Sequence, residues 1–308
     1  MTASETTGRP TVRVESASPV TCGDVSVAAS TVAHVSLAQP SPAPRGPVST
    51  RLGDRDLFVL SALGTLRYMT GKQLQRICMV DGSSLTQERR TRSLLRRLTD
   101  QKLVVRLDRR VGGVRAGSSG YVYGLSGLGQ AAIGIGGPNG GQRRRVLEVK
   151  PAFLDHLLAV AEVYCDLVDA TRSGAVELLA FEGEPAAWRT FPGASGEAVT
   201  LKPDGYARLA MGDIESSAFI EVDLATESPM TLHRKCMTYV SYWRSGIEQA
   251  AHEVFPLVAW LTTTEHRAMR IAEVIQRLPG ETHRLFDVAL LSDVVVTLTT
   301  TALGGRMA

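Results

Sequence analysis

The chain has 308 residues with 34 basic and 31 acidic side chains, so its formal net charge of +3 is close to zero. That balance hides a division, because residues 51–150 hold 19 basic and 7 acidic residues and residues 151–308 hold 12 basic and 21 acidic ones. The basic half, at a net +12, indicates a nucleic-acid partner. The apolar runs are too short to cross a membrane, and the four scattered cysteines argue against a zinc ribbon or a disulfide framework. We therefore expect a cytoplasmic protein without a membrane partner.

The length predicts about two domains. Residues 1–50 contain no aromatic side chain and end in a Pro-rich stretch, which favours a disordered tail. A Gly-rich stretch near residue 138, followed by three arginines, indicates a linker. The expected organisation is a tail over 1–50, a first domain over 51–136, a linker over 137–150, a second domain over 151–300 and a short tail over 301–308.

The basic half has the element order of a winged helix-turn-helix, in which three helices precede a β-hairpin. Apolar spacing and capping residues predict the helices, and Gly and Ser residues predict the hairpin tip. We expect helices over 54–63, 71–78, 84–99 and 128–135, strands over 103–107 and 121–125, and a tip over 108–120.

Arginines gather on the third predicted helix and on the hairpin tip. Arginine pairs with phosphate oxygens or with the edge of guanine, so these side chains are candidates for contact with duplex DNA. Helical spacing brings Arg89, Arg92 and Arg96 together and turns the leucines of the helix away. The alternative is an ordinary solvated face. The candidate DNA-binding residues are Arg89, Arg90, Arg92, Arg96, Arg97, Arg109, Arg110 and Arg115.

The second half mixes helices and strands in the order α-β-β-β-α-β, with additions. This order predicts a layered α/β (α+β) domain around a mixed sheet. We expect helices over 153–172, 231–245 and 266–277, and strands over 176–181, 199–210, 218–224, 255–261, 286–291 and 294–298.

An acidic constellation lies in this second half. Asp204 follows Lys202-Pro203, and Glu221 and Asp223 alternate along one strand, so they share a face of the sheet. Lys235 is on the next helix, four residues before a tyrosine. Carboxylates at neighbouring strand ends suit Mg²⁺ or Mn²⁺ and metal-dependent phosphodiester cleavage, with Asp204 and Glu221 as the candidate ligands.

Two interpretations of the acidic residues remain open. Asp204, Glu221, Asp223 and Lys235 are candidate catalytic residues, and Glu162 on the preceding helix is expected to approach the same edge. Alternatively, acidic residues at strand ends are solvated edge residues, and Pro203-Asp204-Gly205 is ordinary turn chemistry. The histidines show no metal-ligand spacing.

Asp204 followed by Glu221-x-Asp223 resembles the PD-(D/E)xK nuclease superfamily. The Pro203-Asp204 pair matches that pattern, whereas Asp223 stands where the superfamily usually has lysine. Lys235-x-x-x-Tyr239 resembles an arrangement in which the following helix supplies the basic residue. The resemblance implies a nuclease-like mixed-sheet domain after the winged helix-turn-helix.

Residues 51–300 also resemble the replication-relaxation family of actinobacterial plasmids and other mobile elements. That resemblance implies a DNA-binding accessory protein of replication, relaxation or transfer, with double-stranded DNA as partner. It leaves a relaxase, a replication initiator and a second copy of the chain as candidate protein partners. The alternatives are a metal-dependent endonuclease or nickase and a transcription regulator. The matching segments are Arg55-Asp56, Tyr123-x-Leu125-x-x-x-Gly129, Lys202-Pro203-Asp204-Gly205, Glu221-Val222-Asp223-x-x-Thr226-Glu227 and Lys235 to Tyr242.

Overall fold

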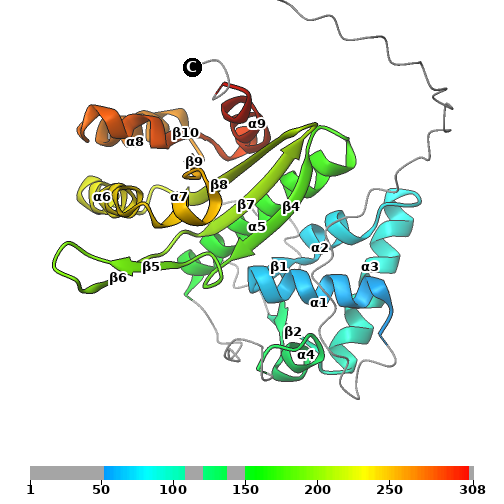
Figure 1. Cartoon of the computed structure of the whole chain (residues 1–308). Helices are drawn as coiled ribbons and strands as arrows, with labels where there is room; N and C mark the ends of the chain where they lie inside the picture. The colour runs from blue at the N-terminus through cyan, green and yellow to red at the C-terminus, as the bar shows by residue number, and fades with distance from the viewer. Residues whose placement is uncertain (1–51, 108–120, 137–149, 305–308) are drawn as a thin grey trace, which may run out of the picture. The chain divides into compact units, whose positions relative to one another are not determined.

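A computed structural model of the chain describes residues 52–107, 121–136 and 150–304 (Figure 1). The predicted N-terminal tail, the predicted hairpin tip with Arg109, Arg110 and Arg115, and nearly all of the predicted linker lie outside the described residues. Within the described residues, no helix is both long and apolar enough to span a bilayer.

The first half contains the expected helices and hairpin strands, and adds one short strand. This strand, β1, pairs antiparallel with β3, giving a three-stranded sheet in the order β1-β3-β2. The elements are α1 (Asp54–Leu66), β1 (Tyr68–Thr70), α2 (Gly71–Cys78), α3 (Ser84–Asp100), β2 (Val104–Leu107), β3 (Val122–Leu125) and α4 (Gly127–Ala132).

Local side-chain caps explain where α2 and α3 begin. The hydroxyl of Thr70 accepts a hydrogen bond from the backbone N–H of Gln73 at the start of α2, and Ser83 caps α3 in the same way. The buried faces of the helices then meet in one core, with Leu60, Leu74 and Leu98 fully buried. The leucine spacing of α3 therefore turns Arg89, Arg92 and Arg96 toward solvent.

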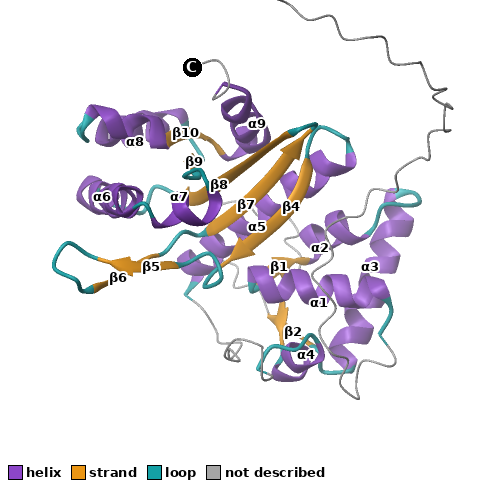
Figure 2. Ribbon diagram, in the orientation of Figure 1, coloured by secondary structure: helices purple, strands orange, loops and turns teal. Residues whose placement is uncertain are grey.

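The second half is a mixed α/β arrangement around a five-stranded sheet in the order β10-β9-β8-β7-β4 (Figure 2). The contacts of β8 with β9 and of β9 with β10 are parallel, and the remaining contacts are antiparallel. The elements are α5 (Pro151–Arg172), β4 (Glu177–Gly183), β5 (Arg189–Pro192), β6 (Ala198–Leu201), β7 (Gly205–Met211), β8 (Ile214–Asp223), α6 (Pro229–Ser245), α7 (Ile247–His252), β9 (Leu257–Thr262), α8 (Glu265–Ile275), the 3₁₀ turns η2 (Gly280–Leu285) and η3 (Leu291–Asp293), β10 (Phe286–Leu290) and α9 (Val294–Gly304).

Helices cover both faces of this sheet. Helices α5 and α9 pack on one face, and α6 and α8 pack on the other. The alternation of β8 divides its residues between the two layers, with Ile220 and Val222 in the α5 core and Phe219 in the α6 core. The expected order α-β-β-β-α-β is present as α5, β4, β7, β8, α6 and β9, and the β5–β6 hairpin is inserted between β4 and β7.

Two predicted strands are wrong. The single strand expected over 199–210 is divided into β6 and β7, because Pro203 has no N–H to donate and the chain turns there. The strand expected over 294–298 is the first part of α9. Its β-branched composition favours a strand, but Val294 and Leu298 are buried one helical turn apart, so packing outweighs propensity.

Helix α5 also packs against the first half of the chain. Arg76 of α2 forms ion pairs with three carboxylates along α5, those of Glu162, Asp166 and Asp169. Burial opposes the charged form of Arg76, but its hydrogen bonds with these aspartates raise its pKa. Glu162 therefore pairs with Arg76 and Gln73 of α2, in place of the expected approach to the sheet edge that holds the acidic constellation.

Candidate functional site

Asp204 lies in the turn that leads into β7 and is 7% exposed. One carboxylate oxygen accepts a hydrogen bond from the backbone N–H of Val222 at 2.8 Å. The other lies 3.0 Å from Nε2 of His156, near the beginning of α5. The backbone N–H of Asp204 donates to the carbonyl of Ile220. These contacts attach the turn to the carboxyl end of β8.

Glu221 lies on β8 and is 1% exposed. Its carboxylate accepts hydrogen bonds from Nζ of Lys235 at 3.0 Å and from the hydroxyl of Tyr239 at 2.6 Å. The i,i+4 spacing on α6 aims both donors at the same carboxylate. Burial, together with the charge of Asp204, raises the pKa of Glu221 to about 7 against the opposing effect of Lys235.

Lys235 connects two carboxylates. Its ammonium lies 3.0 Å from Glu221 and 3.0 Å from Glu227, and 5.5 Å from the ring centroid of buried Trp260. Burial alone would lower the pKa of this lysine, but the charges of Glu221, Asp204 and Glu227 outweigh burial and raise it. Lys235 is therefore a fixed cation beside Glu221.

Asp223 has a different partner, although it shares a face of β8 with Glu221. It forms an ion pair with Arg267 of α8 at 2.6 Å and accepts a hydrogen bond from the backbone N–H of Ala225 at 2.8 Å. The structure thus brings Asp204, Glu221 and Lys235 into one electrostatic cluster and pairs Asp223 with α8.

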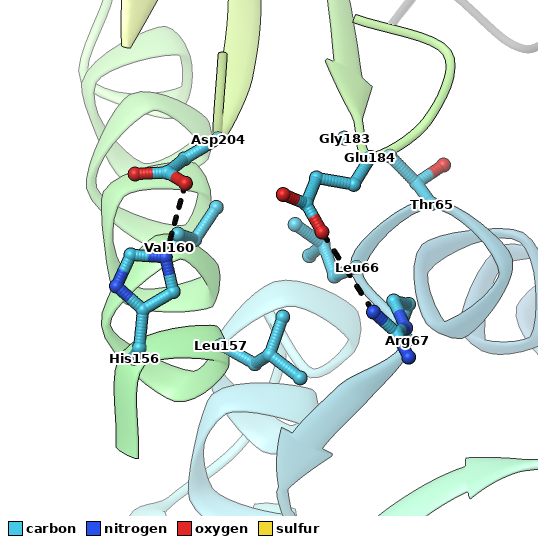
Figure 3. A pocket seen from close by; sticks show the side chains of 9 residues that line it. All are labelled: Thr65, Leu66, Arg67, His156, Leu157, Val160, Gly183, Glu184 and Asp204. Atoms are coloured by element: carbon cyan, nitrogen blue, oxygen red, sulfur yellow. Dashed lines mark hydrogen bonds and ion pairs between the residues drawn. The ribbon is translucent and has the colours of Figure 1, made fainter. Parts of the chain in front are cut away.

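Three residues around a small pocket at Asp204 have no role predicted from the sequence. Figure 3 shows His156 directed at Asp204, and Glu184 directed at Arg67 across the pocket. Burial opposes protonation of His156, but the hydrogen bond and charge of Asp204 raise its pKa. Burial and the charge of Asp204 raise the pKa of Glu184. These residues are far apart in sequence, so no spacing motif connects them.

The described carboxylates do not fit a metal site in this arrangement. Both oxygens of Asp204 and both oxygens of Glu221 already accept hydrogen bonds or face a histidine. Among the described residues, no group of three or more His, Cys, Asp or Glu side chains is arranged to hold a metal ion. Mg²⁺ or Mn²⁺ would have to displace Lys235 or His156 to reach two carboxylates.

The arginines predicted to contact DNA divide into two groups on α3. Arg89, Arg90, Arg92 and Arg96 are exposed, and Arg92 pairs with Glu88 one turn away. Arg97 instead donates two hydrogen bonds to buried Asp56, at 2.6 and 2.9 Å. Within the described part of the chain, Arg89 and Arg96 form no ion pair, so their guanidinium groups face solvent.

Comparison with known proteins gives one family match. The family model described as replication-relaxation matches residues 60–258. No curated protein sequence matches the chain. Among solved structures, restriction endonuclease FokI and its DNA-bound form are each 10% identical to the chain, with TM-scores of 0.24 and 0.23. The matches cover 83% of this chain and 47% of FokI, so the chain spans about half the length of that protein. TM-scores this low do not establish a shared fold.

Proposed function

We propose, since this chain belongs to the replication-relaxation family, that it is a DNA-binding accessory protein of plasmid or mobile-element replication, relaxation or transfer. Family membership points to the replication-related role. The contact with duplex DNA is assigned to the first half, acting as a winged helix-turn-helix. We further propose that the protein acts in the cytoplasm, together with a relaxase or a replication initiator, and that a second copy of the chain is a candidate partner.

The solvent-exposed arginine face of α3 carries this proposal. Leucines fix the opposite face in the core, so Arg89, Arg92 and Arg96 stand on one side of a helix that is held in place. Exposed guanidinium groups can pair with phosphate oxygens or with guanine. Arg97 is excluded from the proposed contact because it is paired with Asp56.

The test is fluorescence anisotropy with a labelled plasmid-derived duplex over a range of salt concentrations. Alanine at Arg89, Arg92 and Arg96 should weaken binding and lower the slope of log K against log salt by about 0.9 for each phosphate that is no longer neutralised. The matched control places alanine at three exposed arginines of the second half, Arg234, Arg270 and Arg277. Equally weakened binding in the two triple variants would overturn the assignment to α3.

A metal-dependent nuclease is the second candidate function. The observation in its favour is the electrostatic cluster of Asp204, Glu221 and Lys235 in the turn and on β8 and α6. The accessory role is preferred because the carboxylates of Asp204 and Glu221 already accept hydrogen bonds from other groups of the protein. A transcription regulator would share the arginine face, and footprinting on plasmid-origin or transfer-origin DNA against promoter DNA separates the two roles.

Supercoiled plasmid incubated with the protein and Mn²⁺ distinguishes the nuclease from the accessory protein. The accessory role predicts that the plasmid stays supercoiled. Nicked or linear product that requires Mn²⁺ and disappears in both Asp204→Asn and Glu221→Gln would establish the nuclease instead. Asp213→Asn, at an exposed turn residue between β7 and β8, controls for the removal of one carboxylate.

A further inference from the structure

We propose that Trp188 and Lys202, at the base of the β5–β6 hairpin, form a contact for a single, unpaired DNA strand beside the Asp204 turn. The class of ligand rests on the proposed DNA-binding function. The location is independent of it, because this hairpin belongs to the second half of the chain and not to α3.

The two side chains form a pair across the hairpin. Arg189 is directly opposite Leu201 in the antiparallel register, so Trp188 and Lys202 are the next pair of positions toward the base of the hairpin, away from its turn. Nζ of Lys202 lies 4.8 Å from the ring centroid of Trp188. Trp188 is 36% exposed, and Lys202 is exposed as well. A large aromatic ring and an ammonium group are thus presented to solvent together.

The residues on either side of Trp188 hold the hairpin to the core. Ala187 is fully buried, and the ring of Phe191 lies 5.0 Å from that of Tyr242 on α6. The guanidinium of Arg189 pairs with Glu182 and lies 4.9 Å from the ring centroid of Tyr206. Figure 1 shows the hairpin running out beside α6. Trp188 is therefore exposed on a segment whose neighbouring residues are anchored in the core.

The chemistry of the pair suits an unpaired nucleotide. An indole ring stacks on any base, and the ammonium can pair with the adjoining phosphate, as in single-strand binding sites. Bases inside a duplex are already stacked on their neighbours, so the ring gains little from double-stranded DNA. Asp204 follows Lys202 by two residues, which places the proposed contact at the edge of the acidic cluster. The second half is acidic overall, with a net charge of −9, so stacking has to supply affinity that electrostatics does not.

The test uses the full chain with a labelled oligothymidylate and a duplex of the same length, measured by anisotropy and by tryptophan fluorescence. The native protein should show quenching of tryptophan emission by the single strand. Trp188→Ala should abolish that quenching and bind the single strand at least about fivefold more weakly, with duplex affinity unchanged. Trp188→Phe should retain most of the affinity, and Lys202→Gln should reduce the salt dependence. The matched control is Trp243→Phe, because Trp243 is partly buried and has Arg284 over its ring.

The possible outcomes separate this inference from the proposed function. Unchanged single-strand binding and quenching in Trp188→Ala overturns the single-strand contact, even where the α3 variants no longer bind duplex DNA. A hairpin that serves a protein partner instead gives that same result. An equal reduction of single-strand and duplex binding in Trp188→Ala also overturns the single-strand contact. A reduction confined to the single strand, together with duplex binding that does not depend on the α3 arginines, supports the contact and contradicts the proposed function. Should Trp188→Ala fail to fold, the quenching of the native protein and the Trp188→Phe variant still decide the question.

Discussion

His156 shows how one side chain connects α5 to the Asp204 turn. Its ring lies 3.0 Å from the Asp204 carboxylate, and Glu184 and Lys235 are the other charged groups that act on its pKa. The pKa of the histidine is raised in the folded protein, so the folded state binds the proton more tightly than the unfolded state. The resulting stabilisation is complete below the unfolded pKa and is lost as the pH rises through the higher folded pKa.

We therefore predict that His156→Gln costs more stability in acid than in base. The difference in the free energy of unfolding between the native protein and this variant should be largest near about pH 6 and should shrink toward about pH 9. Urea denaturation at several pH values measures it. His233→Gln, at an exposed histidine of α6, is the control and should leave the pH profile unchanged. A pH-independent cost would show that the ring acts by packing alone.

Two neighbouring arginines of α3 should separate stability from DNA binding. Arg97→Ala removes its two hydrogen bonds to Asp56, which is 3% exposed, and should cost about 1–3 kcal/mol of stability because this buried carboxylate loses its cationic partner and keeps only the backbone N–H of Gly53. Arg96→Ala removes an exposed side chain and should leave stability within about 0.5 kcal/mol. For duplex DNA we expect the reverse: Arg96→Ala should weaken binding, and Arg97→Ala should leave the affinity of the folded protein unchanged. Chemical denaturation and anisotropy measure the two quantities. A stable Arg97→Ala variant that binds DNA weakly, or a destabilised Arg96→Ala variant with full affinity, would contradict the prediction.

At the level of elements, local patterns predicted most helices and strands, and tertiary packing decided the remainder. The caps and leucine spacing of α2 and α3 are local signals, so their ends fall within a residue or two of those expected. Strand β1 is three residues long and exists because β3 pairs with it, so no local pattern marks it. The run that begins at Val294 has strand composition but forms a helix, because Val294 and Leu298 pack one turn apart into the α5 core.

The candidate site was predictable only where residue types repeat at short spacing. Glu221 lies on one strand with Asp223, and Lys235 lies on one helix with Tyr239, so alternation and helical periodicity placed each pair on a common face. The partners were not predictable. Arg267 of α8 pairs with Asp223, and His156 contacts Asp204 across 48 positions of sequence. Such contacts depend on the way the layers pack, which composition does not encode.

The helical state of α9 can be tested directly at Thr300, which is exposed on this helix. Thr300→Pro should destabilise the protein by about 3 kcal/mol, because proline in a helix interior removes a hydrogen bond and clashes with the preceding turn. Thr300→Ala should be neutral or slightly stabilising, since alanine favours the helix. Urea denaturation compares the two. A proline variant as stable as the alanine variant would mean that α9 contributes nothing to the fold.

The two halves of the chain differ in charge, and the structure joins them through α2 and α5. Three of the acidic residues of the second half neutralise Arg76, so part of the charge division is an internal interface. Gln73 adds hydrogen bonds to α5, and Arg172 of α5 donates to the last carbonyls of α2. The buried residues of the two halves also form one hydrophobic cluster, in which Leu74 and Cys165 are fully buried. We infer that the proposed DNA-binding half depends on the second half for its stability.

The domain boundary predicted near the linker can be tested on these grounds. The full chain should unfold in one cooperative thermal transition, because a shared core couples the two halves. A fragment of residues 52–149 exposes the α2 surface that α5 covers, and it should melt at a lower temperature over a broader range. Arg76→Met in the full chain should lower the melting temperature without altering the arginine face of α3, and Lys72→Met, at an exposed residue of α2, is the matched control. Circular dichroism follows all four proteins. A fragment that melts as sharply and at the same temperature as the full chain would show instead that the first half folds independently and that the α2–α5 interface is a docking contact between two domains.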